Sequence, residues 1–279
     1  MTATSHLHDP QALYRQWEDE QWNPWAIDLA SDREEWQRAL SEEDKGFIYW
    51  ALSSLMVAEE RITTKFAGLV MAAETEEEAS YLASQQVDEA RHMQFYARFQ
   101  DEAIAEPATI AEHVARSREK LGDSFTIIFD QALVSAHERL AANPTDLSAK
   151  VDFVTIYHLV IESTLGLTAF QFITRYLNNN KLLTGFVHGY SRIHHDEQRH
   201  IAYGVWYLRQ AVERDPALAD QIRNKLHELL PAVASALAPP DRGDTDWEAL
   251  GASSDEIHGF ALEGLTRRLN ILGVPLSVS

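Results

Sequence analysis

The chain has 279 residues, of which 45% are hydrophobic and 24% are charged, so it is long enough to bury a substantial core. Its 43 acidic residues outweigh 24 lysines and arginines, and the resulting net charge of -19 argues against nucleic acid as a partner. Cysteine is absent, which excludes disulfides, thiolate metal sites and cysteine nucleophiles, so any metal has to be bound by histidine and carboxylate.

The distribution of apolar residues, glycine and proline indicates the class of fold. The first ten residues lack a basic start followed by an apolar core, and no run of about 18 uncharged apolar residues occurs. We therefore expect a cytoplasmic protein with no membrane span. Two long intervals lack proline, Pro24 to Pro107 and Pro144 to Pro216, and strand-like alternation is nowhere sustained. These patterns predict an all-α protein with long helices.

In chain order, the polar, tryptophan-rich residues 1–40 predict an arm that packs on the main body. Capping boxes at Ser41 with Asp44 and at Thr75 with Glu78 open the first two long helices. Apolar periodicity and turn signals predict helices over 41–73, 75–106, 109–120, 124–142, 146–177, 182–213 and 217–237, the last one ending before Pro239-Pro240. We expect one domain over 1–279, with a bundle over about 41–213 and C-terminal helices and a tail over about 214–279.

One short pattern occurs twice in the predicted helices. Residues 88–92 read DEARH and residues 196–200 read DEQRH. Each copy follows a helix that carries a glutamate inside apolar sequence, Glu59 before the first copy and Glu162 before the second. Two similar helical hairpins predict a four-helix bundle.

The repeated pattern also predicts a metal site. Residues three apart share a helix face, so each Glu-x-x-His pair can present an oxygen and a nitrogen to one point. Buried glutamates are costly unless they are paired or bind metal, and four of them balance two divalent cations. We predict a dinuclear site with six ligands: Glu59, Glu89, His92, Glu162, Glu197 and His200. The alternative is a set of buried salt bridges to Arg61, Arg91 and Arg199.

With its ligands in this order, the sequence resembles the ferritin-like di-metal carboxylate proteins, and within them the R2 group of ribonucleotide reductase, from Trp22 to Leu208. The segment Gln21–Leu29, QWNPWAIDL, resembles the stretch that opens R2 proteins. The resemblance implies a ferritin-like four-helix bundle core with additional helices. It also implies that Trp22 lies near the metals and joins a hydrogen-bonded relay with Asp196 and His92, which would orient this ligand.

Two further segments are similar to the R2-like ligand-binding oxidases: residues 59–63, EERIT, and residues 196–204, DEQRHIAYG. This resemblance implies a cofactor of Mn and Fe, or of two Fe, that reacts with O2, and a bound long-chain fatty acid. It implies an ether cross-link between Tyr157 and Ile62, where the family has valine. A homodimer is expected by analogy, and the electron donor stays open.

Three alternatives share the ligand order. In a radical-generating R2 subunit, Tyr96, one helical turn after His92, would hold the radical. No tyrosine follows Tyr207, so the relay that exports such a radical would be missing, which favours the oxidase. A non-catalytic ferritin-like iron-binding protein would use the same ligands without a cross-link or an organic ligand. Acyl-carrier-protein desaturases and bacterial multicomponent monooxygenases share the ligands but not the entry segment around Trp22.

Overall fold

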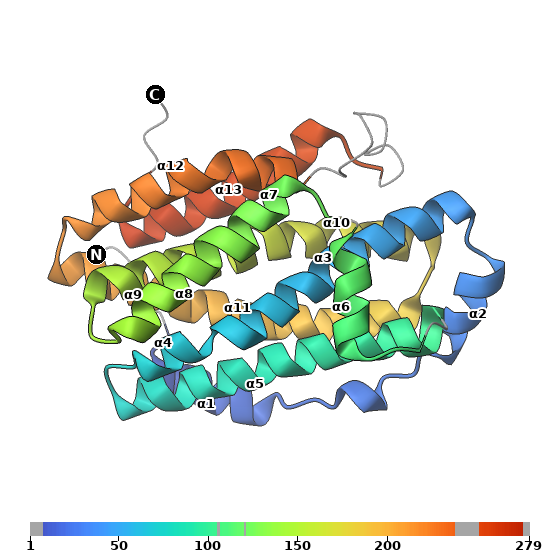
Figure 1. Ribbon diagram of the computed structural model, residues 1–279, viewed down its shortest axis with the longest axis horizontal. Coiled ribbons are helices and arrows are strands. Elements are labelled where there is room, and N and C mark those ends of the chain that lie inside the picture. Colours follow the sequence, from blue (N-terminus) through green and yellow to red (C-terminus); the bar gives the residue numbers. More distant parts are fainter. Residues whose placement is uncertain (1–7, 105–106, 120, 238–250, 276–279) are drawn as a thin grey trace, which may run out of the picture.

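The protein folds into a bundle of helices that run along its longest axis (Figure 1). The computed structural model describes residues 8–104, 107–119, 121–237 and 251–275, and within these ranges it contains helices and turns but no strand. The all-α fold expected from the sequence is therefore confirmed.

Four long helical segments form the centre of the bundle. They are α3 (Glu42–Lys65), α5 (Glu76–Phe99), a third segment composed of α9 (Leu147–Val154), the π-helix η4 (Thr155–Gly166) and α10 (Leu167–Asn180), and α11 (Thr184–Arg214). Helix α3 packs on α5, η4 packs on α11, and α5 also contacts α11. The four segments thus enclose one common interior.

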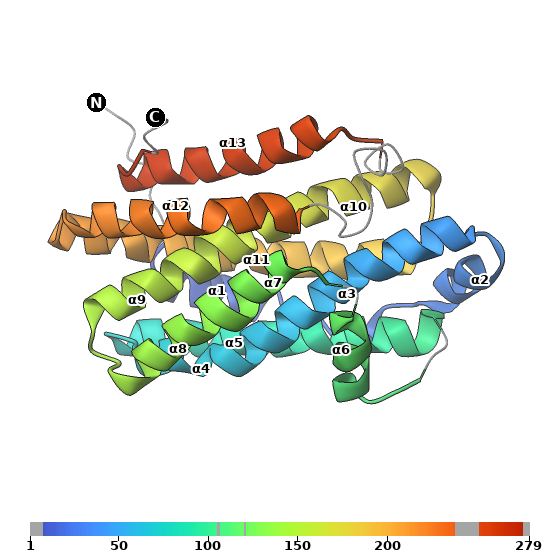
Figure 2. The same cartoon turned by 45° about the horizontal axis from the view of Figure 1, so that its top comes forward.

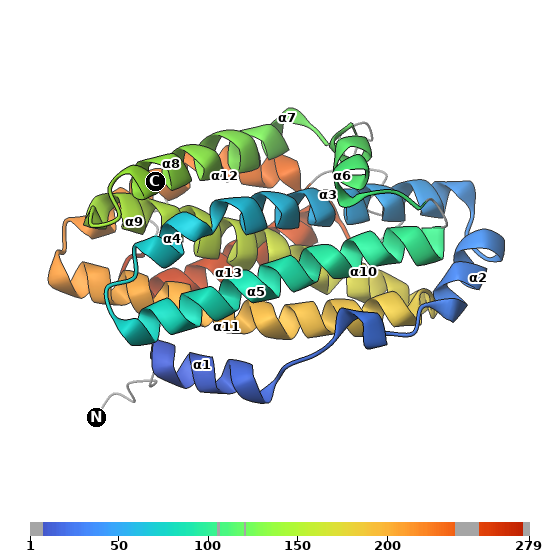
Figure 3. The same ribbon diagram turned by 60° about the horizontal axis from the view of Figure 1, so that its bottom comes forward.

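The N-terminal arm lies along one side of this core. It contains α1 (Pro10–Asp19), the short helix η1 (Pro24–Ala26) and α2 (Ala30–Arg38). Figure 3 shows α1 beside α5 and α11, and both contacts are present in the structure. Leu13, Ile27 and Leu29 of the arm are buried, so the arm is part of the packed core.

The remaining helices cover other sides of the core. On the outer side of η4 lie α12 (Leu218–Ala236) and α13 (Ser254–Leu272), both of which pack against it (Figure 2). Between the two hairpins come η2 (Gln100–Ile104), α6 (Ile110–Arg118), α7 (Asp123–Phe125), η3 (Thr126–Ala132) and α8 (Leu133–Ala142). Helix α6 stands across the bundle and contacts α3 (Figure 1). The predicted break at Pro239-Pro240 lies outside the described residues.

The helix starts agree with the sequence better than the helix ends do. Ser41 caps α3 by accepting a hydrogen bond from the Asp44 amide, and Thr75 caps α5 in the same way through Glu78. The reciprocal half of the second capping box is absent, because the Glu78 carboxylate accepts from Lys150 and from the Glu74 amide instead. The first long helix ends at Lys65, and α4 (Ala67–Met71) follows as a separate helix.

The third segment is the most apolar part of the described chain. By length and composition, Leu147–Asn180 would be able to cross a membrane, but 72% of its most apolar window is buried inside the fold. This burial is typical of a core helix. Because η4 lies between α11 on one side and α12 and α13 on the other, its side chains are enclosed by protein on most faces.

Candidate metal centre

The six residues predicted as metal ligands converge in the interior of the bundle. Helix α3 contributes Glu59, η4 contributes Glu162, and α5 and α11 each contribute a Glu-x-x-His pair. Their donor atoms form two groups, within each of which the atoms lie no more than 4.8 Å apart. The groups are Glu59, Glu89, His92 and Glu197, and Glu89, Glu162, Glu197 and His200. Glu89 and Glu197 therefore belong to both, an assignment that the sequence left open.

Both histidines turn the same nitrogen toward the carboxylates. His92 Nδ1 lies 3.4 Å from Glu89 Oε2, 3.5 Å from Glu197 Oε1 and 3.6 Å from Glu59 Oε1. His200 Nδ1 lies 3.1 Å from Glu89 Oε1 and 3.2 Å from Glu162 Oε1. Each group thus offers one imidazole nitrogen and three carboxylates, a donor set that suits iron and manganese.

Several atoms of the cluster are buried without a hydrogen bond. In the part of the chain that the structure describes, one oxygen of each of the four glutamates has no hydrogen-bond partner, and neither has His92 Nδ1. Buried polar atoms are almost always satisfied, and leaving one unpaired costs about 1–3 kcal/mol. Because these atoms face one another, two cations between them would satisfy the set. The residues fit a pair of metal ions.

The ionisation of the cluster leads to the same conclusion. Burial, together with the neighbouring Glu89 and Glu197, raises the pKa of Glu59 to about 8 against the opposing charge and hydrogen bond of His92. Burial and the nearby Glu197 also raise the pKa of Glu162 well above its usual range. Burial therefore disfavours the charged form of Glu59 and Glu162 unless cations are bound beside them.

The arginines of the alternative interpretation pair elsewhere. Arg91 donates to Asp88 Oδ1 at 2.7 Å, and Arg199 donates to both Asp88 and Asp196. Arg61 pairs with Asp130 on η3, with 2.6 Å between Nε and Oδ1. These contacts direct the positive charges to aspartates and not to the four glutamates.

The predicted relay from Trp22 is present as a chain of hydrogen bonds. The Trp22 indole donates to Asp196 Oδ2 at 2.7 Å, and the same oxygen lies 3.1 Å from His92 Nε2. Burial alone would raise the pKa of Asp196. These hydrogen bonds and the charge of Arg199 outweigh that effect and hold the pKa of Asp196 below its usual range. An ionised Asp196 accepts from Nε2–H and leaves the lone pair of Nδ1 free to face the cluster.

Tyr157, Ile62 and Tyr96 all lie close to the cluster. The Tyr157 hydroxyl donates a short hydrogen bond to Glu89 Oε1, and its ring packs on Phe66 with 5.2 Å between centroids. Ile62 lies on α3 between Glu59 and the helix end, where Phe66 follows; it is buried and lines the same pocket as Glu59. Tyr96 lines that pocket too, and its buried hydroxyl has no hydrogen-bond partner among the described residues.

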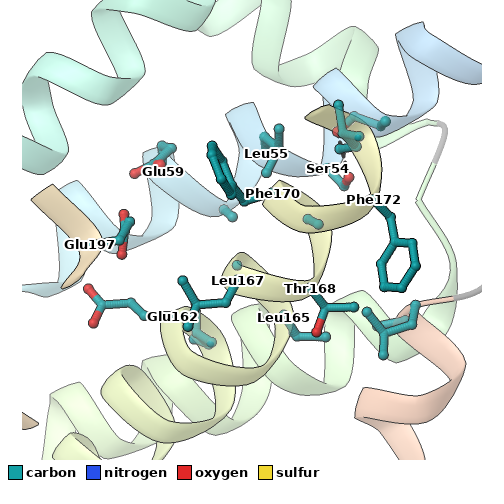
Figure 4. Close-up of a pocket in the computed structure, with 18 of the residues that line it drawn as sticks. Ser54, Leu55, Glu59, Glu162, Leu165, Leu167, Thr168, Phe170, Phe172 and Glu197 are labelled. Carbon is teal, nitrogen blue, oxygen red and sulfur yellow. Dashed lines mark hydrogen bonds between the residues drawn. The ribbon is translucent and has the colours of Figure 1, made fainter. Parts of the chain in front are cut away.

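An apolar pocket leads away from the cluster. Figure 4 shows Glu59, Glu162 and Glu197 at one end, with Leu165, Leu167, Phe170 and Phe172 extending from them. The lining also includes Leu237, which follows α12, and Ile257 on α13. The pocket therefore combines an acidic end, where the two metals fit, with a long apolar wall.

Comparison with known proteins decides the family. The sequence profile described as "Ribonucleotide reductase, small chain" matches residues 4–234, which is most of the chain. The chain belongs to the ribonucleotide reductase small chain family. The resemblance to the R2 group found in the sequence is thereby confirmed.

Solved structures similar to this small-chain family member are variants of an R2-like ligand-binding oxidase with a reconstituted Mn/Fe cofactor. A tyrosine-to-phenylalanine variant, reconstituted aerobically, has a TM-score of 0.81 at 20% identity and covers 99% of this chain and 96% of its own. A glycine-to-phenylalanine variant has a TM-score of 0.82 at 21% identity and covers 99% of this chain and 100% of its own. At this identity the likeness shows a common fold.

The structure adds a second relay to this small-chain protein that we did not predict. Asp88 Oδ2 lies 3.2 Å from His200 Nε2, and Asp88 Oδ1 accepts from the Trp17 indole at 2.9 Å. Asp88 opens the first copy of the repeated motif, as Asp196 opens the second. The repeat alone would therefore have been enough to predict that Asp88 pairs with His200. Trp17 could not be assigned in the same way, because the arm has no internal repeat.

Proposed function

We propose that this protein is an O2-activating oxidase of the R2-like ligand-binding type, which performs two-electron oxidations with a Mn/Fe pair or with two iron ions. The observation that carries the proposal is the junction of the two ligand groups with an apolar pocket, because three of the carboxylates line that pocket. A buried acidic cluster that opens onto apolar walls suits the oxidation of C–H bonds with water excluded.

The protein residues hold the site in a defined arrangement. Glu59 and His92 would serve the first metal and Glu162 and His200 the second, with Glu89 and Glu197 belonging to both groups. The resemblance to the R2-like ligand-binding oxidases implies manganese at the first position and iron at the second. Bound there, the metals would supply O2 reduction and the removal of two electrons from neighbouring bonds. Asp196 and Asp88 fix the two imidazoles, and Tyr157 is held by Glu89 with its proton already in a hydrogen bond.

Tyr157 and Ile62 are the residues that we expect to be oxidised. Joining Tyr157 Oη to Ile62 Cβ forms one C–O bond and breaks the O–H and C–H bonds. It releases two protons and two electrons, and the electrons reduce O2. Two contacts support the pair: Tyr157 packs on Phe66, one turn from Ile62 on α3, and Glu89 is placed to accept the phenolic proton.

The cross-link can be tested by peptide mapping. The metal-free chain is loaded with Mn(II) and Fe(II), exposed to air and digested with trypsin, which cuts after Arg61, Lys65, Lys150 and Arg175. We expect the peptide 62–65 joined to the peptide 151–175 with the loss of two hydrogens. Tyr157→Phe removes the phenol and should give two free peptides. Free peptides in the wild type after confirmed metal and oxygen uptake would refute the cross-link.

A long-chain fatty acid is the proposed occupant of the pocket. The apolar wall suits an alkyl chain, and the acidic end suits a carboxylate once two cations are bound beside Glu162. Organic extraction of the purified metal-loaded protein followed by mass spectrometry should release about one fatty acid per chain. Leu167→Trp, which narrows the wall, should lower this yield while the metal content stays unchanged.

A radical-generating small subunit is the second candidate, because the relay from Trp22 and the buried Tyr96 both lie at the cluster. Electron paramagnetic resonance after O2 exposure distinguishes a radical-generating subunit from the oxidase. A stable tyrosyl signal that is lost in Tyr96→Phe would favour this function. Uptake of many more than two iron ions per chain would instead favour an iron store.

The cellular setting follows from the same proposal. We infer a cytoplasmic homodimer that receives electrons from an unidentified donor. The burial of Leu147–Asn180 supports a core role for the most apolar segment. Sedimentation velocity tests the dimer.

A further inference from the structure

A group of aromatic side chains that do not line the pocket extends from the metal centre. The Tyr157 ring contacts the His158 ring with 4.5 Å between centroids, and His158 contacts Tyr203 at 5.3 Å. Tyr203 in turn contacts Trp206 at 5.9 Å. Tyr157 and Tyr203 are fully buried, whereas Trp206 is partly exposed on α11. The group therefore connects the cluster with the surface.

Tyr203 can also be reached without Tyr157. Its ring lies 5.4 Å from the ring of Tyr81, a buried tyrosine whose hydroxyl has no hydrogen-bond partner among the described residues. His200 and Glu162 both influence the ionisation of Tyr81 electrostatically, so Tyr81 lies near the second ligand group. A cross-linked Tyr157 would thus leave Tyr81 as a second ring beside Tyr203.

Tyr203 has a proton acceptor already in place. Its hydroxyl donates to Glu78 Oε1 at 2.6 Å, and Lys150 Nζ donates to the same oxygen at 2.9 Å. Burial and the adjacent Glu78 raise the pKa of Tyr203 well above its usual range, so the phenol keeps its proton at neutral pH. Loss of one electron makes the phenol a strong acid, and the proton can then move along the existing hydrogen bond.

The buried ion pair between Lys150 and Glu78 supports a functional role. Lys150 and Glu78 are each only 2% exposed. A buried salt bridge contributes little to stability, and apolar residues of the same volume often replace it without loss. A charged carboxylate held against a tyrosine hydroxyl is, however, the arrangement that reversible proton-coupled oxidation of that tyrosine requires.

We propose that Tyr203 conducts single electrons between the metal centre and a surface donor site at Trp206. In each transfer Tyr203 would give one electron to the centre, which O2 would have oxidised, and its hydroxyl proton would move to Glu78, leaving a neutral tyrosyl radical. An electron from Trp206 restores Tyr203 and the proton returns from Glu78. A small one-electron reductant in solution, such as ascorbate, then reduces Trp206.

The test uses the intact metal-loaded protein after the cross-link has formed. The centre is reduced with dithionite, the reductant is removed under anaerobic conditions and O2 is then added, so that two of the four electrons that reduce O2 to water must come from the protein. A Trp206 that loses two electrons in succession adds an oxygen atom from water and releases two protons, so its mass rises by one oxygen. Trypsin cuts after Arg199 and Arg209, which places Tyr203, Trp206 and Tyr207 in one peptide. Fragmentation mass spectrometry locates the added oxygen.

We expect oxidised Trp206 in the wild type and at least fivefold less in Tyr203→Phe, which keeps the ring and removes the phenol. Tyr176→Phe is the matched control, because Tyr176 also donates to a carboxylate, Asp44, at 2.7 Å, but lies outside this group of rings. It should behave as the wild type. Metal content and circular dichroism verify that each variant is folded. Trp206→Phe gives a second readout, since a Tyr203 radical that has lost its donor should persist longer in freeze-quenched samples.

This proposal rests on the proposed oxidase function, and the same samples separate the two. Consumption of O2 with an unmodified Trp206 in the wild type would overturn the conduction path alone. Equal Trp206 oxidation in the wild type and in Tyr203→Phe would also overturn it. Absence of O2 consumption by the metal-loaded protein would overturn both proposals.

Discussion

The side chains of Tyr157 and Glu162 both reach the cluster although they lie five residues apart on one helix. Five residues of an α-helix rotate by about 140° beyond one full turn, so in that geometry the two side chains would point apart. The π-helix η4 has a wider turn, closed by hydrogen bonds between residues five apart, and brings both to the same face. The irregular helix is therefore what places a tyrosine and a glutamate at one site.

Glu162→Gln should lower the metal content from two ions per chain toward one, because Glu162 belongs to the second ligand group alone. The metal-free variant should be more stable by on the order of 1 kcal/mol, since burial disfavours the charged carboxylate. Elemental analysis after gel filtration and thermal unfolding measure the two effects. Glu59→Gln is the matched variant for the first group. Two ions retained in both variants would refute the ligand assignment.

Asp88→Asn and Asp196→Asn should each weaken metal binding by roughly 10–100-fold, because each aspartate orients one histidine of the cluster. Competition with a chelator of known affinity measures the change. Asp101→Asn is the control, since Asp101 pairs with the buried His113 at 2.8 Å away from the metals. An equal loss in all three variants would indicate general destabilisation.

Metal addition should stabilise the folded chain strongly. A ligand that binds the native state alone stabilises it by roughly 4 kcal/mol at a thousandfold excess over Kd, and here it also relieves the repulsion between Glu59, Glu89 and Glu197. Anaerobic titration with Mn(II) or Fe(II), followed by calorimetry, should raise Tm by several degrees. Mg(II), which prefers oxygen ligands, should give a smaller rise. No shift with any of these ions would contradict the metal site.

Gly204→Ala should destabilise the protein by about 1–3 kcal/mol, because the new Cβ would lie 2.2 Å from His158 Cβ at the contact between α11 and η4. Gly259→Ala on α13 meets no atom within 4 Å and removes a glycine from a helix, so it should stabilise the protein by roughly 0.5–1 kcal/mol. Chemical denaturation of both variants tests the pair. A neutral Gly204→Ala would mean that α11 and η4 can separate without cost.

The sequence was sufficient to predict the helices and the six residues that cluster, because apolar periodicity and the repeated Asp-Glu-x-Arg-His pattern are local signals. It was not sufficient to predict features that depend on packing between distant residues. Nothing in residues 155–166 distinguishes a π-helix from an α-helix, and the pairing of Glu78 with Lys150 joins residues 72 positions apart. The organisation of 1–279 as one domain stays a prediction, as do the roles of the site residues.

The two ligand groups have the same inventory of donors, three glutamates and one histidine each. Donor type therefore gives neither position a chemical preference for manganese over iron, and general affinity trends would favour iron at both. A preference of one position for manganese would have to arise from what surrounds the donors: Ile62 and Tyr96 lie near Glu59 and line the pocket, whereas Gln85 donates to Glu162. In a Mn/Fe protein of this fold, discrimination between the two ions would thus be a property of the packed interior around the ligands.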